Sequence, residues 1–439
     1  MQTAYAKAEE TRCGEDILLR WLPSRNPDQD FWWKFLGRQL AVMVKEAGYS
    51  IEKQYETLLV LYHWIVPYLG QRPQSNGSLK LKSRINHHGV PFMLCWHWDT
   101  PTSCPEVHLT VDAIGKSTRT AMDPLNQFPA EELLHRVSGI LPEVVLTWHN
   151  HFQSAWYDHD KAKQVQSLIS GTVSGKLAHG EDPGTVLTPT MTPLCFKFTP
   201  DKNLIVKSQF VPMDLHRMGL PPLSQLLPAI RALEPNNAAL DAFCRFHETS
   251  SEGKHLKCYM LTVDNVAPLS RLRIFCGSPS NSFASLREIM TLGGRITGID
   301  KQLQSLLDLI TAATRASTGT TTSPDLVRHA YDDVPILLSN CIYYFDITPG
   351  RQLPEIRLDF AFRNLAADDL TLAKTVTSWL ESQGRGAYCQ NYLRMLQSLT
   401  DGKLAESYGL QPYIGCMIRD GQFDVWSYLS VGGLLPRGE

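Results

Sequence analysis

The sequence lacks any run of about 18 apolar residues, the length that a transmembrane helix needs. Its first 16 residues have no apolar core and carry three glutamates, which argues against a secretory signal peptide. The formal net charge is only −2 over 439 residues, so neither nucleic acid nor a membrane surface is an expected partner. We therefore expect a cytoplasmic protein.

The ten cysteines show no CxxC motif and no paired spacing, and they are scattered from Cys13 to Cys416. This usage is typical of a reduced intracellular protein with free thiols. The histidines of His87-His88 and His149-Asn150-His151 lack partners at metal-ligand spacing. Asp332-Asp333 and Asp368-Asp369 lack the third aspartate of a DDxxD motif, and each is better explained as a helix start. No metal site is predicted.

What the sequence does contain is a repeated alternation of strand pairs and helical segments. Tight turns join the strands of each pair, as at Asp420-Gly421, a dipeptide that favours hairpins. The predicted strands are 91–98 and 106–114, 194–198 and 204–211, 256–263 and 271–276, 341–347 and 355–362, and 413–419 and 422–431. The predicted helices are 30–47, 51–69, 129–141, one after 158, 222–247, 282–290, 299–316, 368–382 and 388–399, with loops at 171–192 and 318–323.

Five hairpins cannot form one parallel sheet, because tight hairpins make antiparallel pairs. Ten antiparallel strands can remove their edges by closing into a barrel with the helices packed outside. The predicted fold is therefore α+β: a ten-stranded antiparallel β-barrel of five hairpin repeats with an outer ring of α-helices. We expect one domain over residues 1–439, with the N-terminal helical segment, about 1–75, outside the barrel. A lumen of this width can hold ligands.

Basic residues recur from hairpin to hairpin, on the second strand of the first four and at the turn of the fifth. Period-two alternation puts Arg271, Arg273 and Phe275 on one face of their strand, with Leu272 and Ile274 on the other. Buried cations repel one another unless an anion compensates them, and a diphosphate would suit several converging donors. The alternative is that each base faces solvent between the helices. The corresponding residues of the other hairpins are His108, Lys207, Arg357 and Arg419, with Tyr428 further along the last strand.

Five short collinear segments resemble the landmarks of the fungal aromatic prenyltransferases of the dimethylallyltryptophan synthase type. The likeness runs from about residue 30 to residue 429. It implies the same barrel, and transfer of a prenyl group from an allylic diphosphate to an aromatic acceptor. It also implies no required cofactor, no strict need for Mg²⁺, and small-molecule partners for a monomer or homodimer. The segments are Phe31-Trp32-Trp33, Val66-Pro67-Tyr68-Leu69-Gly70, Gly89-Val90-Pro91, Asp123-Pro124-Leu125-Asn126 and Thr291-Leu292-Gly293-Gly294-Arg295.

The resemblance also implies residue roles. In the family, an arginine stands at His108, and tyrosines that shield the allylic cation stand at Gln209, Phe275 and Asp359. The family's catalytic lysine falls near Pro193, where the alignment is uncertain. The implied diphosphate-binding residues are His108, Lys207, Gln209, Arg271, Arg273, Arg357, Arg419, Tyr413 and Tyr428. The expected prenyl and acceptor pocket comprises Ile85, Met93, Phe275, Asp359 and Trp426, and the candidates for removing the final proton are His97, His108 and Asp359.

Met93 stands where indole-using members place a glutamate that accepts the indole N–H. This apolar side chain favours a phenolic, polyketide-derived acceptor, whose hydroxyl already activates the ring. Two alternatives stay open. Met93 fills space while His97 binds an indole, or the barrel binds or cyclises an aromatic metabolite without prenyl transfer. Gln209 and Asp359 also remove ring bulk from the wall, so we expect geranyl as well as dimethylallyl donors, provided that Arg357 neutralises Asp359.

Overall fold

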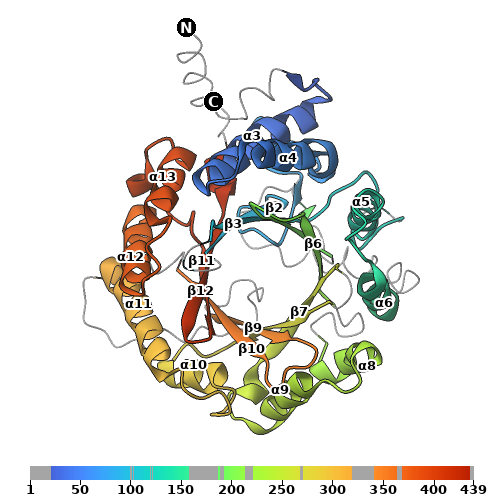
Figure 1. Cartoon of the computed structure of the whole chain (residues 1–439). Coiled ribbons are helices and arrows are strands. Elements are labelled where there is room, and N and C mark those ends of the chain that lie inside the picture. Colours follow the sequence, from blue (N-terminus) through green and yellow to red (C-terminus); the bar gives the residue numbers. More distant parts are fainter. Residues whose placement is uncertain are drawn as a thin grey trace.

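The computed structural model describes residues 21–98, 101, 103–118, 120, 122–157, 186–187, 192–212, 221–266, 270–318, 341–362 and 368–435. Ten antiparallel strands form a closed barrel in the order β10-β11-β12-β2-β3-β5-β6-β7-β8-β9 (Figure 1). The predicted fold class is therefore confirmed. The strands are β2 (Phe92–Trp98), β3 (Glu106–Val111), β5 (Leu194–Phe198), β6 (Ile205–Phe210), β7 (Lys257–Asp264), β8 (Leu272–Ser278), β9 (Cys341–Ile347), β10 (Glu355–Ala361), β11 (Tyr413–Arg419) and β12 (Gln422–Leu429).

Figure 1 shows the helices as a ring around the barrel, with α3 and α4 lying outside it. Two further short strands, β1 (Leu81–Lys82) and β4 (Val186–Leu187), pair in parallel apart from the barrel. The described helices are α3 (Pro27–Glu46), α4 (Ile51–Val60), α5 (Phe128–Ser138), α6 (Thr147–Trp156), α8 (Leu223–Leu233), α9 (Ala238–Thr249), α10 (Phe283–Met290), α11 (Asp300–Thr318), α12 (Asp369–Ser382) and α13 (Cys389–Leu399). No helix in these ranges is both long and apolar enough to cross a bilayer.

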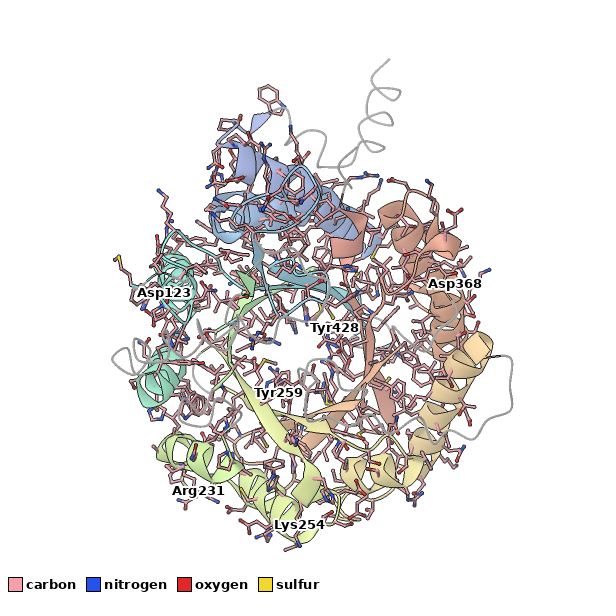
Figure 2. All side chains as sticks on the ribbon, turned by 180° about the vertical axis from the view of Figure 1, so that it is seen from behind. Asp123, Arg231, Lys254, Tyr259, Asp368 and Tyr428 are labelled. Atoms are coloured by element: carbon pink, nitrogen blue, oxygen red, sulfur yellow. The ribbon has the colours of Figure 1, made fainter. Side chains whose placement is uncertain are left out.

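The main hydrophobic core lies between the helices and the outer face of the barrel. Alternate residues of each strand point into this layer, as Leu272 and Ile274 of β8 do with no exposed surface. Aromatic rings from helix and strand meet there, for example Phe243 of α9 and Phe345 of β9, whose centroids are 4.6 Å apart. The remaining alternate residues face the lumen. Seen from behind, Tyr259 lies at the inner wall of the barrel (Figure 2).

Local sequence signals set most helix ends. The Asn26 side chain accepts hydrogen bonds from the Asp28 and Gln29 N–H groups, and Pro27 opens α3. The helical stretch predicted over 222–247 contains two helices, and the second begins where Asn237 caps α9 by accepting the Leu240 N–H. The predicted helix 51–69 also departs from α-geometry: α4 ends at Val60, and a π-turn (Leu61–Ile65) and a 3₁₀ turn (Val66–Tyr68) follow.

Helix α6 was not predicted from the sequence. Its histidines are held by tertiary contacts: His149 Nδ1 lies 2.9 Å from Ser208 Oγ, and His151 Nε2 lies 2.8 Å from the Ala229 carbonyl oxygen. These contacts explain why a segment rich in Trp, His and Asn is helical despite modest propensity. The helix predicted after residue 158, the loop at 318–323 and nearly all of the loop at 171–192 lie outside the described residues.

Candidate active site

One cavity occupies the barrel lumen, with an empty volume of about 1340 Å³ that includes its open mouth. All the side chains predicted for the site line it, so the sequence placed each of them on the correct face. They come from seven of the ten strands, together with Ile85 and Arg271 from the segments that precede β2 and β8. The set is Ile85, Met93, His97, His108, Lys207, Gln209, Arg271, Arg273, Phe275, Arg357, Asp359, Tyr413, Arg419, Trp426 and Tyr428.

Carboxylates already pair with Arg273 of β8 and with Arg271 just before that strand. Arg273 is bound by Asp264 Oδ1 at 2.9 Å and by Asp346 Oδ1 at 2.8 Å, and Arg271 Nε donates to Asp264 Oδ2 at 3.1 Å. Burial by itself would raise the pKa of Asp264, but Arg273, Lys207 and Arg271 overcome it and hold that pKa well below its usual range. The idea that only a bound anion could compensate these bases is therefore wrong, because the protein supplies its own counter-ions.

Lys207 is the exception, because its charge is poorly compensated. Its side chain is only 12% exposed, and its Nζ lies 3.9 Å from Asp264 Oδ1, beyond hydrogen-bond distance. Burial, followed by repulsion from Arg273, lowers the pKa of Lys207 to about 8. An additional anion in the lumen would therefore be stabilised most by Lys207.

Arg357 and Asp359 form a second buried pair, as their spacing on one strand face predicts. Arg357 Nε and Nη2 donate to the two Asp359 oxygens at 2.6 and 2.8 Å, and Tyr344 Oη donates to Asp359 Oδ2 at 2.5 Å. The guanidinium also lies over the Trp426 ring, 3.9 Å from its centroid. Gly415 of the intervening strand makes this reach possible, since a Cβ there would lie 2.2 Å from Asp359 Oδ1.

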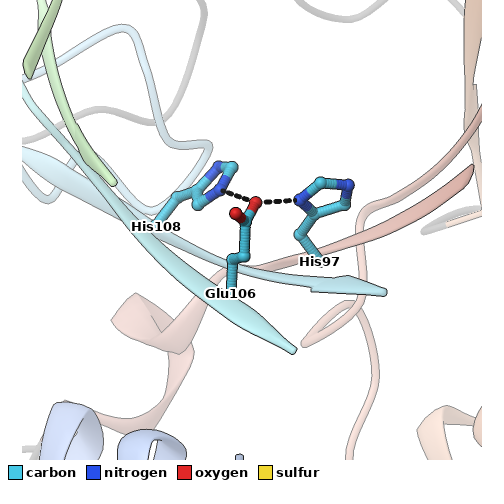
Figure 3. A group of neighbouring side chains, drawn as sticks. All are labelled: His97, Glu106 and His108. Atoms are coloured by element: carbon cyan, nitrogen blue, oxygen red, sulfur yellow. Dashed lines mark hydrogen bonds and ion pairs between the residues drawn. The ribbon is translucent and has the colours of Figure 1, made fainter. Parts of the chain in front are cut away.

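A third cluster surrounds Glu106 on β3 (Figure 3). Its Oε2 atom lies 2.6 Å from His97 Nδ1, 2.7 Å from Lys197 Nζ and 3.7 Å from His108 Nε2. The other His97 nitrogen, Nε2, lies 2.7 Å from Asp424 Oδ1. With a carboxylate on each ring nitrogen, His97 is fully hydrogen-bonded only when both nitrogens carry protons.

Aromatic rings wall the remaining part of the lumen. Tyr259, Phe275, Tyr344 and Tyr413 pack in one buried cluster, with the Phe275 and Tyr344 centroids 4.0 Å apart, and Tyr428 packs against it. Such faces attract a cation and exclude water. The wall therefore suits a carbocation better than the sequence suggested.

A family model described as tryptophan dimethylallyltransferase matches residues 28–395. The chain is 39% identical to "Prenyltransferase anuH" of Penicillium roqueforti over 421 residues, which cover 93% of this chain and 90% of the relative. It is 38% identical to "Xanthone prenyltransferase A" of Emericella nidulans over 438 residues, or 95% of each chain. The chain belongs to the tryptophan dimethylallyltransferase family. It is a prenyl-transferring enzyme, and the resemblance seen in its motifs is confirmed.

Solved structures agree with the fold. The crystal structure of AnaPT from Neosartorya fischeri superposes with a TM-score of 0.77 at 19% identity, covering 98% of this chain and all of that one. The structure of NotF in complex with brevianamide F and DMSPP gives a TM-score of 0.76 at 19% identity, covering 95% of this chain and 97% of that one. At this identity the likeness supports the barrel alone.

Sequence reasoning missed several lumen residues of this prenyltransferase. The comparison of basic residues used the second strands of the hairpins, whereas Tyr259, Tyr344 and Lys197 lie on first strands. Period-two alternation would have found Lys197 and Tyr344, but not Tyr259, because an irregularity in the β7 register between Cys258 and Met260 lets the consecutive residues Tyr259 and Met260 both line the cavity. The paired carboxylates carried no comparable signal, because an aspartate at a strand end is equally typical of a turn.

Proposed function

We propose that this prenyltransferase moves a dimethylallyl or geranyl group from its diphosphate to a phenolic acceptor, without requiring a metal ion. The proposal of a phenolic substrate rests on Met93. This residue stands in the cavity wall, and its side chain offers no hydrogen-bond acceptor for an indole N–H. One relative is named for a xanthone, an oxygen-containing aromatic that has no N–H. The alternative in which His97 binds an indole is not supported, because both of its ring nitrogens face carboxylates.

Breaking the donor's C–O bond leaves an allylic cation and a diphosphate that gains negative charge. Lys207, Arg271 and Arg273 would stabilise that leaving group, and the two arginines need little rearrangement because ion pairs already hold them in place. Asp264 and Asp346 supply that preorganisation by fixing both guanidinium groups. The tyrosine wall would hold the cation dry until the acceptor attacks it.

The last step removes a proton from the prenylated ring. Asp359 already accepts hydrogen bonds from Arg357 and Tyr344, and His97 is bound on both sides. His108 Nε2 is buried and, among the described residues, has no hydrogen-bond partner. Burial lowers the pKa of His108 well below its usual value although the Glu106 carboxylate opposes this shift, and repulsion from Lys207 and His97 adds to it, so the ring is neutral at pH 7. A protonated arene is acidic enough for a weak base, which favours His108 among the three.

The function is tested by incubating the protein with dimethylallyl or geranyl diphosphate and panels of phenols and indoles, with and without EDTA. Products are identified by mass spectrometry. We expect a prenylated phenol, and turnover that survives millimolar EDTA, because arginine and lysine replace a metal at the diphosphate. Complete inhibition that Mg²⁺ reverses would contradict metal independence, and products from indoles alone would contradict the phenolic acceptor.

Geranyl diphosphate should be used at least as well as dimethylallyl diphosphate. Gln209 and Asp359 leave the wall less crowded than tyrosines would, and each additional buried CH₂ contributes about 0.8 kcal/mol. The pairing of Asp359 with Arg357 removes the repulsion that its charge would otherwise exert on the donor. The measurement is kcat/KM for both donors with one accepted phenol. A tenfold preference for the shorter donor would show that Tyr259 and Tyr344 refill the space.

Activity and stability should respond to alkaline pH in opposite directions. Above a pH of about 8 the free enzyme loses the Lys207 charge, so kcat/KM for the donor should fall by up to about tenfold per pH unit. The pKa of Lys207 is lower in the folded state than in the unfolded state, which binds more protons between pH 8 and about 10, so this group makes stability rise there. Rate and urea-unfolding profiles of wild type and Lys207→Met check both trends. Profiles of identical shape would contradict the assignment.

A further inference from the structure

The cluster around Glu106 brings three metal-binding atoms together inside the lumen. His97 Nδ1, Glu106 Oε2 and His108 Nε2 all lie within 4.8 Å of one another (Figure 3). His97 and Glu106 are opposite each other in the β2–β3 ladder, and His108 lies two residues further along β3 on the same face. His108 is only 8% exposed, and its Nε2 has no hydrogen-bond partner among the described residues, so one ligand atom is free for a metal.

The donor set is that of a borderline divalent cation. Two imidazole nitrogens and one carboxylate oxygen suit Zn²⁺, which binds such groups at about 2.0–2.2 Å. Mg²⁺ prefers six oxygen ligands, and this cluster offers one carboxylate, so the same residues give no reason for a magnesium requirement. His97 and His108 line the cavity, so a metal ion can reach these two ligands from the lumen.

An orienting carboxylate is also in place. Asp424 Oδ1 lies 2.7 Å from His97 Nε2, so it would accept that N–H while Nδ1 binds the metal. Carboxylates in this position fix the ring and raise the basicity of the liganding nitrogen. The present occupant beside Glu106 is the Lys197 ammonium, 2.7 Å from Oε2, and it would compete with a metal ion for the same oxygen.

We propose that His97, Glu106 and His108 bind one Zn²⁺ ion and that zinc bound there inhibits prenyl transfer. Binding takes the proton from His97 Nδ1 and displaces Lys197 from Glu106. It also occupies His108 Nε2, the free base of the lumen. The ring of His97 stacks on Trp426 at 4.3 Å, so the change reaches the aromatic wall. The inhibitory part rests on the proposed function, whereas the binding part does not.

The binding part is tested by titrating EDTA-treated, dialysed full-length protein with ZnCl₂ in a calorimeter. We expect one site per chain. His108→Gln and Glu106→Gln should each weaken binding at least about tenfold, because each removes a ligand. Asp424→Asn should weaken it by about tenfold through the orientation of His97. Lys197→Met should tighten binding, because it removes the competing charge while leaving the three ligands.

The matched control is His135→Gln, which removes an exposed histidine of α5 and should leave zinc affinity unchanged. Circular dichroism verifies that each variant is folded, and Glu106→Gln serves if His108→Gln does not fold. Absence of binding, or equal affinity in wild type and both ligand variants, would overturn the site. Zinc that binds with the expected variant pattern but leaves turnover unchanged would overturn inhibition. A protein that transfers no prenyl group but shows this binding pattern would refute the proposed function and keep the site.

Discussion

Gly415→Ala is expected to lower kcat/KM for prenyl transfer by about a hundredfold, although it adds only one methyl group. A Cβ at this position would lie 2.2 Å from Asp359 Oδ1 and 2.8 Å from Arg357 Nε, closer than side chains tolerate. Asp359 is locked by Arg357 and Tyr344, so the clash must shift the pair rather than one free end. Overpacking costs about 1–3 kcal/mol, and misplacing a site by about 1 Å can cost about a hundredfold in rate.

Two comparisons test whether the clash with the Arg357–Asp359 pair causes the expected loss of activity in Gly415→Ala. Gly139→Ala places its Cβ 3.5 Å from the His135 carbonyl oxygen, an ordinary contact, and should leave both rate and stability unchanged. The double variant Gly415→Ala/Asp359→Ala should be no slower than Asp359→Ala alone, because the methyl then occupies space that the carboxylate has left. Steady-state kinetics of the four variants decide the matter. Additive losses in the double variant would show that the methyl group acts through its contact with Arg357 Nε rather than through Asp359.

The fold was predictable because its signals are local. Strands such as 271–276 show period-two alternation, and Asp420-Gly421 marks a hairpin that needs no distant information. The predicted boundaries of 194–198, 341–347 and 413–419 agree with β5, β9 and β11 to the residue. The inward direction of the bases followed from the same alternation, once all five hairpins were assumed to share one lumen.

The electrostatics of the site were not predictable in this way. His97 and Asp424 are 327 positions apart and meet only because β12 pairs with β2 where the barrel closes. Arg273 meets Asp264 and Asp346 through the registers of two neighbouring strand pairs. A single sequence fixes which face a residue takes, but it does not fix its neighbour across the ladder. The positive lumen expected from the bases is therefore a lumen of ion pairs.

Lys207 and Arg273 differ in how fully carboxylates compensate their charges, and the loss of either residue should have a large effect. Lys207→Met should slow turnover by ten- to a hundredfold, since a charge-assisted contact to the leaving group contributes about 1.5–3 kcal/mol. Its stability should stay the same or rise, because burial disfavours the Lys207 charge and Asp264 keeps Arg273 and Arg271.

Arg273→Met should slow turnover as well, but it should also lower the free energy of unfolding by about 3–5 kcal/mol. The substitution leaves Asp346, which is only 6% exposed, with Arg271 at 4.0 Å, and Asp264 loses its closest partner. Urea unfolding at pH 7 and steady-state kinetics on the same preparations give both quantities. If Lys207→Met were the more destabilised of the two, the weak compensation of Lys207 would be refuted. If neither variant lost activity, the diphosphate would have to bind through the other cations predicted for it in the lumen, Arg271, Arg357 and Arg419.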